Sequence, residues 1–164
     1  LFPLTVNVTL NPDTANPDSL KISEDRKSIK GLKRFEYKRS VLGCQMFSSG
    51  RHFWDVIVSG TRGWFIGVTS KPVNFKDVHA KTRKWQIWEW EGQYTALSPS
   101  KCFELVLSER PTRIRISLNC EGGQVSFFDA KTAALLHTFS DTSLVGETLL
   151  PYFSLHEGTC VTLL

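Results

Sequence analysis

The chain has 164 residues, of which 41% are hydrophobic and 22% are charged. This length and composition fit one globular domain with its own apolar core, and they exclude a disordered chain. No apolar run approaches the roughly 18 residues that a membrane-spanning helix needs, so we expect no membrane insertion. The formal net charge is +4, with the basic residues concentrated in the first 90 positions.

Alternation of apolar and polar residues predicts β-strands along the whole chain. The first alternating segment is 5–10, and a helical turn is expected at 13–16, with Asp13 or Thr14 as its cap. No segment carries a ten-residue helical stripe. Short strands separated by glycine-containing turns predict an all-β, antiparallel β-sandwich. The further strands are expected at 52–58, 64–68, 85–90, 103–107, 113–119, 124–129, 135–139, 149–155 and 160–164.

Two of these segments carry more detailed predictions. Trp54 shares one face of its strand with Val56 and therefore is expected to anchor the core. Gly122 or Gly123 can adopt the positive φ that a tight turn needs, which predicts a hairpin of the strands on either side.

The cysteine and histidine residues give no sign of a metal site or of catalysis. The four cysteines form no C-x-x-C pair, and no histidine lies at zinc-ligand spacing from them. We expect free thiols in a reducing, cytoplasmic setting, with three of them buried beside apolar strands. Hydrolase, phosphate-loop and metalloprotease motifs are missing from the sequence. The domain is therefore expected to be no enzyme and to hold neither metal nor cofactor.

Three short motifs follow one another along the chain: Leu-Asn-Pro at 10–12, Phe-Trp-Asp-Val at 53–56 and Leu-Asn-Cys-Glu at 118–121. They resemble the LDP, WEVE and LDYE motifs of PRY-SPRY domains, which are found in tripartite-motif E3 ubiquitin ligases and in butyrophilins. The resemblance covers nearly the whole chain. It implies a concanavalin-like jelly roll, with a PRY part at about 1–50 and a SPRY part at about 51–164.

The segment 85–90, Trp-Gln-Ile-Trp-Glu-Trp, is the most informative part of the chain for function. Alternation separates Trp85 and Ile87 from Trp88 and Trp90. If the first pair fills the core, the second pair faces a partner, because exposed tryptophans often anchor interfaces. The alternative is that all of these side chains pack in the core.

The resemblance also implies where a partner would bind. In a family member that binds antibodies, the later two tryptophans of the matching strand contact the partner, and Trp88 and Trp90 align with them. Lys71 stands where that protein has an acidic contact, which argues against antibody recognition here. Loops 31–40, 71–84 and 155–159 would line the surface. The expected partner-binding residues are Lys38, Arg39, Ser40, Lys71, His79, Trp88, Trp90, Tyr94, His156 and Glu157.

Among these residues, Lys38, Arg39 and Ser40 match a region in which some family members hold a peptide C-terminus. With Lys71, they are expected to pair with an acidic group. Tyr94 is expected to add apolar contact beside Trp88.

We therefore expect a protein- or peptide-recognition module. The resemblance implies a parent that is a cytoplasmic ubiquitin ligase of innate immunity, dimeric through a coiled coil upstream. The chain begins without Met or a signal sequence, so we expect it to be part of a longer protein.

Two alternatives remain open. The sequences at 41–44 and 49–52 match butyrophilins, some of which sense small phosphorylated ligands, although Phe65 replaces a histidine of their basic pocket. An RNA-binding domain is the other alternative, because basic residues cluster between positions 26 and 39.

Overall fold

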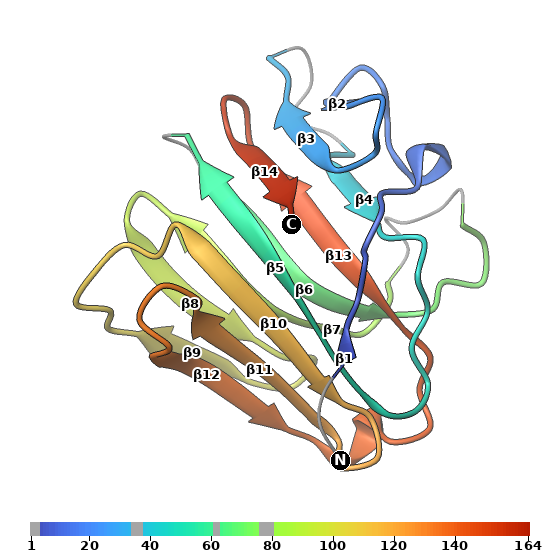
Figure 1. Cartoon of the computed structure of the whole chain (residues 1–164), viewed down its shortest axis with the longest axis vertical. Helices are drawn as coiled ribbons and strands as arrows, with labels where there is room; N and C mark the ends of the chain where they lie inside the picture. Colours follow the sequence, from blue (N-terminus) through green and yellow to red (C-terminus); the bar gives the residue numbers. More distant parts are fainter. Residues whose placement is uncertain (1–3, 34–37, 61–62, 76–80) are drawn as a thin grey trace.

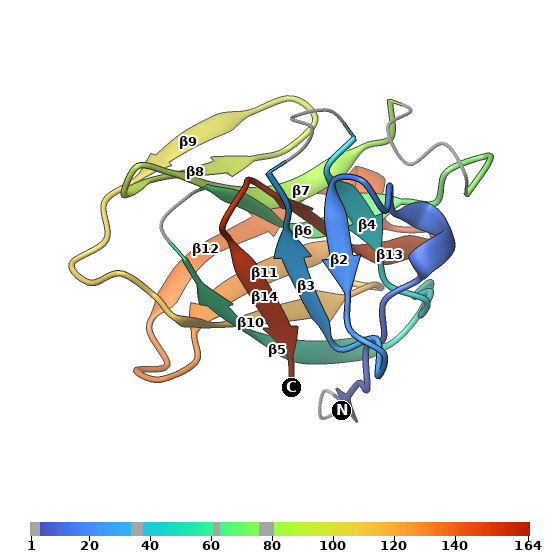
Figure 2. The same ribbon diagram turned by 90° about the horizontal axis from the view of Figure 1, so that it is seen from above.

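The computed structural model describes residues 4–33, 38–60, 63–75 and 81–164. Its strands form two sheets that pack face to face (Figures 1 and 2). Within the described residues the helical segments are two short 3-10 turns, η1 (Pro12–Thr14) and η2 (Thr142–Leu144). The predicted all-β sandwich is therefore confirmed.

The larger sheet has eight strands in the order β12-β11-β10-β5-β14-β3-β2, and β1 adds to it as a parallel neighbour of β5. The pairs along this order are antiparallel. The strands are β1 (Leu4–Thr5), β2 (Leu20–Ile22), β3 (Ser28–Gly31), β5 (Arg51–Ser59), β10 (Arg113–Asn119), β11 (Gln124–Asp129), β12 (Leu135–Ser140) and β14 (Cys160–Leu163).

The smaller sheet has six antiparallel strands in the order β4-β13-β6-β7-β8-β9. The edge strands β9 and β12 of the two sheets lie on the same side of the sandwich (Figure 2). The strands are β4 (Ser40–Leu42), β6 (Trp64–Ser70), β7 (Lys84–Trp90), β8 (Gln93–Leu97), β9 (Cys102–Leu105) and β13 (Leu149–Leu155).

Alternate side chains of the central strands fill the space between the sheets. The largest are Trp54, Trp64 and Trp85, with exposed fractions of 1%, 2% and 0%. Their burial removes a large apolar area from water, at roughly 25 cal/mol per Å², and so supplies much of the stability. The prediction that Trp54 anchors the core is confirmed.

The predicted hairpin of β10 and β11 is also confirmed. The strands pair from Ile114 with Asp129 to Asn119 with Gln124, and the turn lies between them. Gly123 has a φ of +63°, and its backbone N–H donates to the carbonyl oxygen of Cys120 at 3.3 Å. Of the two glycines, Gly123 therefore supplies the left-handed conformation.

The N-terminal predictions need two corrections. Of the strand expected at 5–10, only the start belongs to a strand, β1, because β14 occupies the edge of β5 from Val56 onward; Leu10 adds an isolated bridge to Gly43. Val8 and Leu10 nevertheless are buried, which explains the alternation. The cap of η1 is Asn11, whose side chain accepts from the backbone N–H of Asp13 at 3.1 Å.

All four cysteines are free, as predicted, but burial was predicted for too many of them. Cys120 is buried and Cys160 is partly buried, whereas Cys44 and Cys102 are exposed. Cys102 lies on the edge strand β9, where one side of the strand has no neighbour in its sheet.

Candidate functional site

The two sides of β7 face different surroundings. Trp85 and Ile87 point into the core, with exposed fractions of 0% and 1%. Gln86, Trp88 and Trp90 point away from the core and are half-buried. We call this outward side of the smaller sheet the outer face. The structure thus places the indoles of Trp88 and Trp90 on the surface of the sandwich, as the first of the two sequence interpretations requires.

Aromatic neighbours hold both outer-face indoles in place. The ring of Trp88 stacks on that of its cross-strand partner Phe65, with centroids 5.4 Å apart and an interplanar angle of 1°. The ring of Trp90 lies 4.9 Å from that of His156. Gly63 permits this second contact, because a Cβ there would come within 2.7 Å of Cε3 of Trp90. These contacts order the indoles before any partner arrives, which lowers the entropic cost of binding.

The outer face continues over β13 and β4 as a small apolar cluster. Leu42, Leu150 and Tyr152 are its buried members, and Phe65 and Phe75 pack against them. The hydroxyls of Tyr152 and Ser40 are hydrogen-bonded at 2.8 Å. Burial raises the pKa of Tyr152. The cluster over β4 and β13 thus has a buried centre with Phe65 and Phe75 partly exposed at its surface, and Trp88 and Trp90 beside it are half-buried.

Two lysines flank this apolar cluster. The Nζ atom of Lys84 lies 5.3 Å from the ring centroid of Tyr152, and that of Lys71 lies 5.8 Å from the ring centroid of Phe75. Lys84 donates to the hydroxyl of Thr82 at 3.1 Å, and burial lowers its pKa. Sequence reasoning missed Lys84, although it shares the alternation of Gln86 and Trp88 and could have been found from it.

Arg39 and Ser40 do not lie where the sequence suggested. Both are buried, with exposed fractions of 6% and 5%. The Arg39 guanidinium donates to the carbonyl oxygens of Leu155 and Leu32, and so it links the end of β13 to the segment that follows β3. The expectation that Arg39 pairs with an acidic group of a partner is therefore corrected. Lys38, beside it, is exposed.

Tyr94 also needs correction. It pairs with Glu89 across β7 and β8 and thus shares the inner face with that residue. Only 7% of Tyr94 is exposed, its ring lies 6.2 Å from that of Trp64, and burial raises its pKa. It belongs to the core and cannot contact a partner on the outer face.

Of the remaining expected residues, His156, Glu157 and Lys71 are described by the structure and His79 is not. His156 and Glu157 are partly buried at the end of β13, where His156 contacts Trp90. Lys71 is exposed at the end of β6. His79 lies outside the described residues. The structure therefore brings together Trp88, Trp90 and His156, with Lys71 near Phe75.

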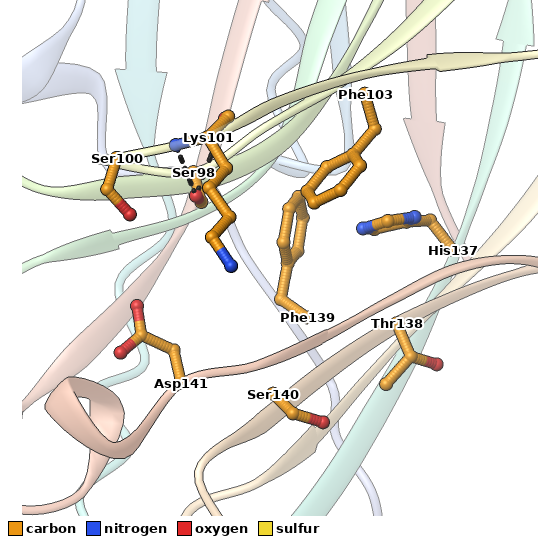
Figure 3. Close-up of a pocket in the computed structure, with 9 residues that line it drawn as sticks. All are labelled: Ser98, Ser100, Lys101, Phe103, His137, Thr138, Phe139, Ser140 and Asp141. Atoms are coloured by element: carbon orange, nitrogen blue, oxygen red, sulfur yellow. Dashed lines mark hydrogen bonds between the residues drawn. The ribbon is translucent and has the colours of Figure 1, made fainter.

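A separate pocket of about 400 Å³ lies between the edge strands β9 and β12 (Figure 3). Phe103, His137 and Phe139 form its aromatic side, and Lys101 and Asp141 lie opposite them. Burial lowers the pKa of His137. Asp141 already accepts from Nε1 of Trp85 at 3.2 Å and from the backbone N–H of Ser143 at 2.9 Å, so its carboxylate serves the fold.

Among the described residues, no group of three or more His, Cys, Asp and Glu side chains is placed to hold a metal ion. In the same part of the chain, no helix is long and apolar enough to cross a bilayer.

Comparison with known proteins places this architecture in a family. The SPRY domain family matches residues 51–164. Nuclear factor 7 of ovary from Xenopus laevis is 36% identical over 96% of this chain, and the match covers 28% of that protein. Butyrophilin subfamily 2 member A2 from Mus musculus is 35% identical over 91% of this chain, and the match covers 31% of that protein. The chain thus spans less than a third of the length of these relatives.

Solved structures agree on the fold. The TRIM65 PSpry domain superposes with a TM-score of 0.80 at 21% identity, over 98% of this chain and 90% of that one. Stonustoxin superposes with a TM-score of 0.76 at 24% identity, over 98% of this chain and 27% of that one. The chain therefore belongs to the SPRY domain family, whose members are generally protein-interaction modules, and it is a PRY-SPRY domain like those of tripartite-motif proteins and butyrophilins.

Proposed function

We propose that the outer face around Trp88 and Trp90 binds a protein or peptide partner. The observation that carries this proposal is the pair of ordered, half-buried indoles on a face whose opposite side already fills the core. Tryptophan is among the residues that contribute most to interfaces, because it buries a large rigid surface at low entropic cost. Partner binding would cover the remaining exposed surface of both rings.

We further propose that the domain selects the target of a tripartite-motif E3 ubiquitin ligase in the cytoplasm. This finer assignment rests on the resemblance of the sequence motifs to that family. The ligase chemistry would reside elsewhere in the parent protein, and this domain would bring the target to it.

The test is an affinity capture from cell extract with two forms of the domain, followed by mass spectrometry. The first form is the natural chain and the second carries Trp88→Ala and Trp90→Ala. We expect the double variant to lose a defined subset of captured proteins while its circular dichroism spectrum stays unchanged. Identical sets from both forms would contradict the proposed site.

The site gives less support to the two alternatives, which are binding of small phosphorylated ligands and binding of RNA. For small phosphorylated ligands, Phe65 stacks on Trp88 at the position of a basic-pocket histidine, and the Arg39 guanidinium already binds two carbonyl oxygens. Binding of RNA stays a prediction from charge alone. Calorimetry with an isoprenoid pyrophosphate and filter binding of RNA against salt concentration test these alternatives directly.

A further inference from the structure

We infer that Lys84 and Lys71 form a subsite for an acidic group of the partner, at the side of the outer face where β7 begins. This inference rests on the proposed function, because it specifies the chemistry of a partner that binds the same face. It replaces Arg39, the residue that the sequence suggested, with a lysine that the sequence analysis did not select.

The first argument is the state of Lys84. Its side chain is half-buried, and among the described residues its Nζ atom donates to the neutral oxygens of Thr82 alone, at 3.1 and 3.4 Å. Among the described residues, the ion pairs involve Arg83, Arg113 and Arg115, and none involves Lys84. An ammonium that is partly removed from water without a counter-ion is unfavourable, so an anion beside it would be stabilising.

The second argument is the place of the two lysines. Lys84 lies over the ring of Tyr152 and Lys71 lies over the ring of Phe75, and both rings belong to one apolar cluster. The cationic groups therefore border apolar surface that excludes water, where an ion pair is stronger than in bulk solvent. A partner segment that carries an acidic group beside an apolar side chain would match this arrangement.

We take the acidic group to be the carboxylate of an Asp or Glu side chain of the partner. A phosphorylated side chain and a free C-terminal carboxylate are the other outcomes of the test. Each presents oxygen acceptors with negative charge to the lysine ammonium groups.

A random dodecapeptide library displayed on phage provides the probe. Peptides are selected on the 164-residue chain, and the enriched sequences are synthesised with a fluorescent label. Each is made with its acidic residue, with the matching amide, with phosphoserine at that position, and with a free or an amidated C-terminus. Affinities for the natural chain and for Lys84→Met, Lys71→Met and Trp88→Ala are measured by fluorescence anisotropy. Lys101→Met, at the exposed position directly before the edge strand β9, is the matched control.

The inference predicts that the enriched peptides share an acidic group. Removing that group or the Lys84 charge should weaken binding by about tenfold, as expected for a partly buried ion pair. Lys71→Met should weaken it less, because Lys71 is exposed, and Lys101→Met should leave it unchanged. Once the acidic group has been replaced by its amide, Lys84→Met should have little further effect. Methionine keeps the apolar stem over Tyr152, and a melting curve of Lys84→Met checks that the fold is retained.

Other results separate the inference from the proposed function. If the peptides bind and lose affinity with Trp88→Ala, but are insensitive to Lys84→Met or carry no shared acidic group, the inference is wrong and the proposed function stands. If no peptide is enriched, or if Trp88→Ala has no effect on binding, the proposed site itself fails and the inference fails with it.

Discussion

The two outward-facing sides of the sandwich differ in how completely their polar groups are paired. On the larger sheet, Asp55 accepts from Arg113 at 2.9 Å and from Arg115 at 2.7 Å, and the Arg115 guanidinium lies 4.3 Å from the ring centroid of Phe53. The hydroxyls of Ser126 and Thr138, on the neighbouring strands β11 and β12, are hydrogen-bonded at 3.0 Å. These polar groups therefore already have partners within the chain.

The outer face of the smaller sheet is different. Nε1 of Trp88 and Oε1 of Gln86 are buried without a hydrogen-bond partner in the structure, and Lys84 has no ion pair among the described residues. Buried polar groups normally are paired, and an exception requires a reason. The difference teaches that a face can contribute to the fold while some of its polar groups stay unpaired within the described residues.

The largest expected effect is the loss of stability when a core indole is removed from β7. Trp85→Ala should destabilise the domain by about 3–5 kcal/mol, because it opens a large cavity in the core. Trp88→Ala should cost clearly less, since its ring is only half-buried. Urea unfolding followed by circular dichroism measures both. Equal losses for the two variants would show that Trp88 is a core residue and would remove the distinction between the faces.

The next effect concerns binding. We expect Trp88→Ala combined with Trp90→Ala to lower the affinity for a captured partner by at least about 2 kcal/mol, or roughly thirtyfold. Interface tryptophans often contribute that much. The matched control is Arg115→Ala combined with Ser126→Ala on the other sheet, which should leave the affinity within about twofold. Surface plasmon resonance gives both values. A larger loss of affinity from the control pair would indicate that the partner binds the larger sheet and not the outer face.

The ion pairs of the larger sheet should contribute a smaller, pH-dependent stability. Burial raises the pKa of Asp55, but hydrogen bonds and charge from Arg115 and Arg113 outweigh it and hold this pKa below its usual range. A lowered folded-state pKa stabilises the native state above the unfolded value of about 3.9, and this contribution is lost as the pH falls through the folded pKa.

Asp55→Asn should therefore destabilise the domain by about 1–2 kcal/mol at pH 7, a value limited by the exposure of both arginines. The difference from the natural chain should shrink at pH 3 or below, where Asp55 takes up a proton. Urea unfolding at a series of pH values measures this. A constant difference across the series would mean that the charge of Asp55 does not contribute.

The smallest effect is the loss of one ring contact. Phe65→Leu removes the stacking on Trp88 but keeps an apolar side chain, so we expect a cost of about 0.5–1.5 kcal/mol in partner affinity. The stability of the domain should change by a similar amount or less. If neither property changes, the stacked geometry of Trp88 is not needed for recognition.

Much of the fold could be predicted from local patterns. The hairpin of β10 and β11 follows from strict alternation around Gly123, and the alternation of β7 places Trp85 on the opposite side from Trp88 and Trp90. The strand expected at 5–10 failed because alternation reports burial and not hydrogen bonding, and Val8 is buried without belonging to a paired strand.

The candidate site was only partly predictable. Alternation separated Trp88 and Trp90 from Trp85 and Ile87, and the family resemblance indicated which of the two pairs faces outward. Arg39 was misassigned, since nothing in the sequence indicates that the carbonyl oxygens of Leu32 and Leu155 surround its guanidinium. Tyr94 was misassigned because its side of the sheet is set by its pairing with Glu89.

The sequence by itself determined the strand pattern, the family and the two sides of β7, because each of these depends on residues that are neighbours in the chain. Tertiary structure alone decided that Arg39 is engaged, that Tyr94 is buried and that Lys84 lies over Tyr152 with no counter-ion from the described part of the chain. The physical reason is that burial and charge pairing depend on side chains from strands far apart in sequence, such as β7 and β13. Those neighbours are fixed only when the sheets have formed.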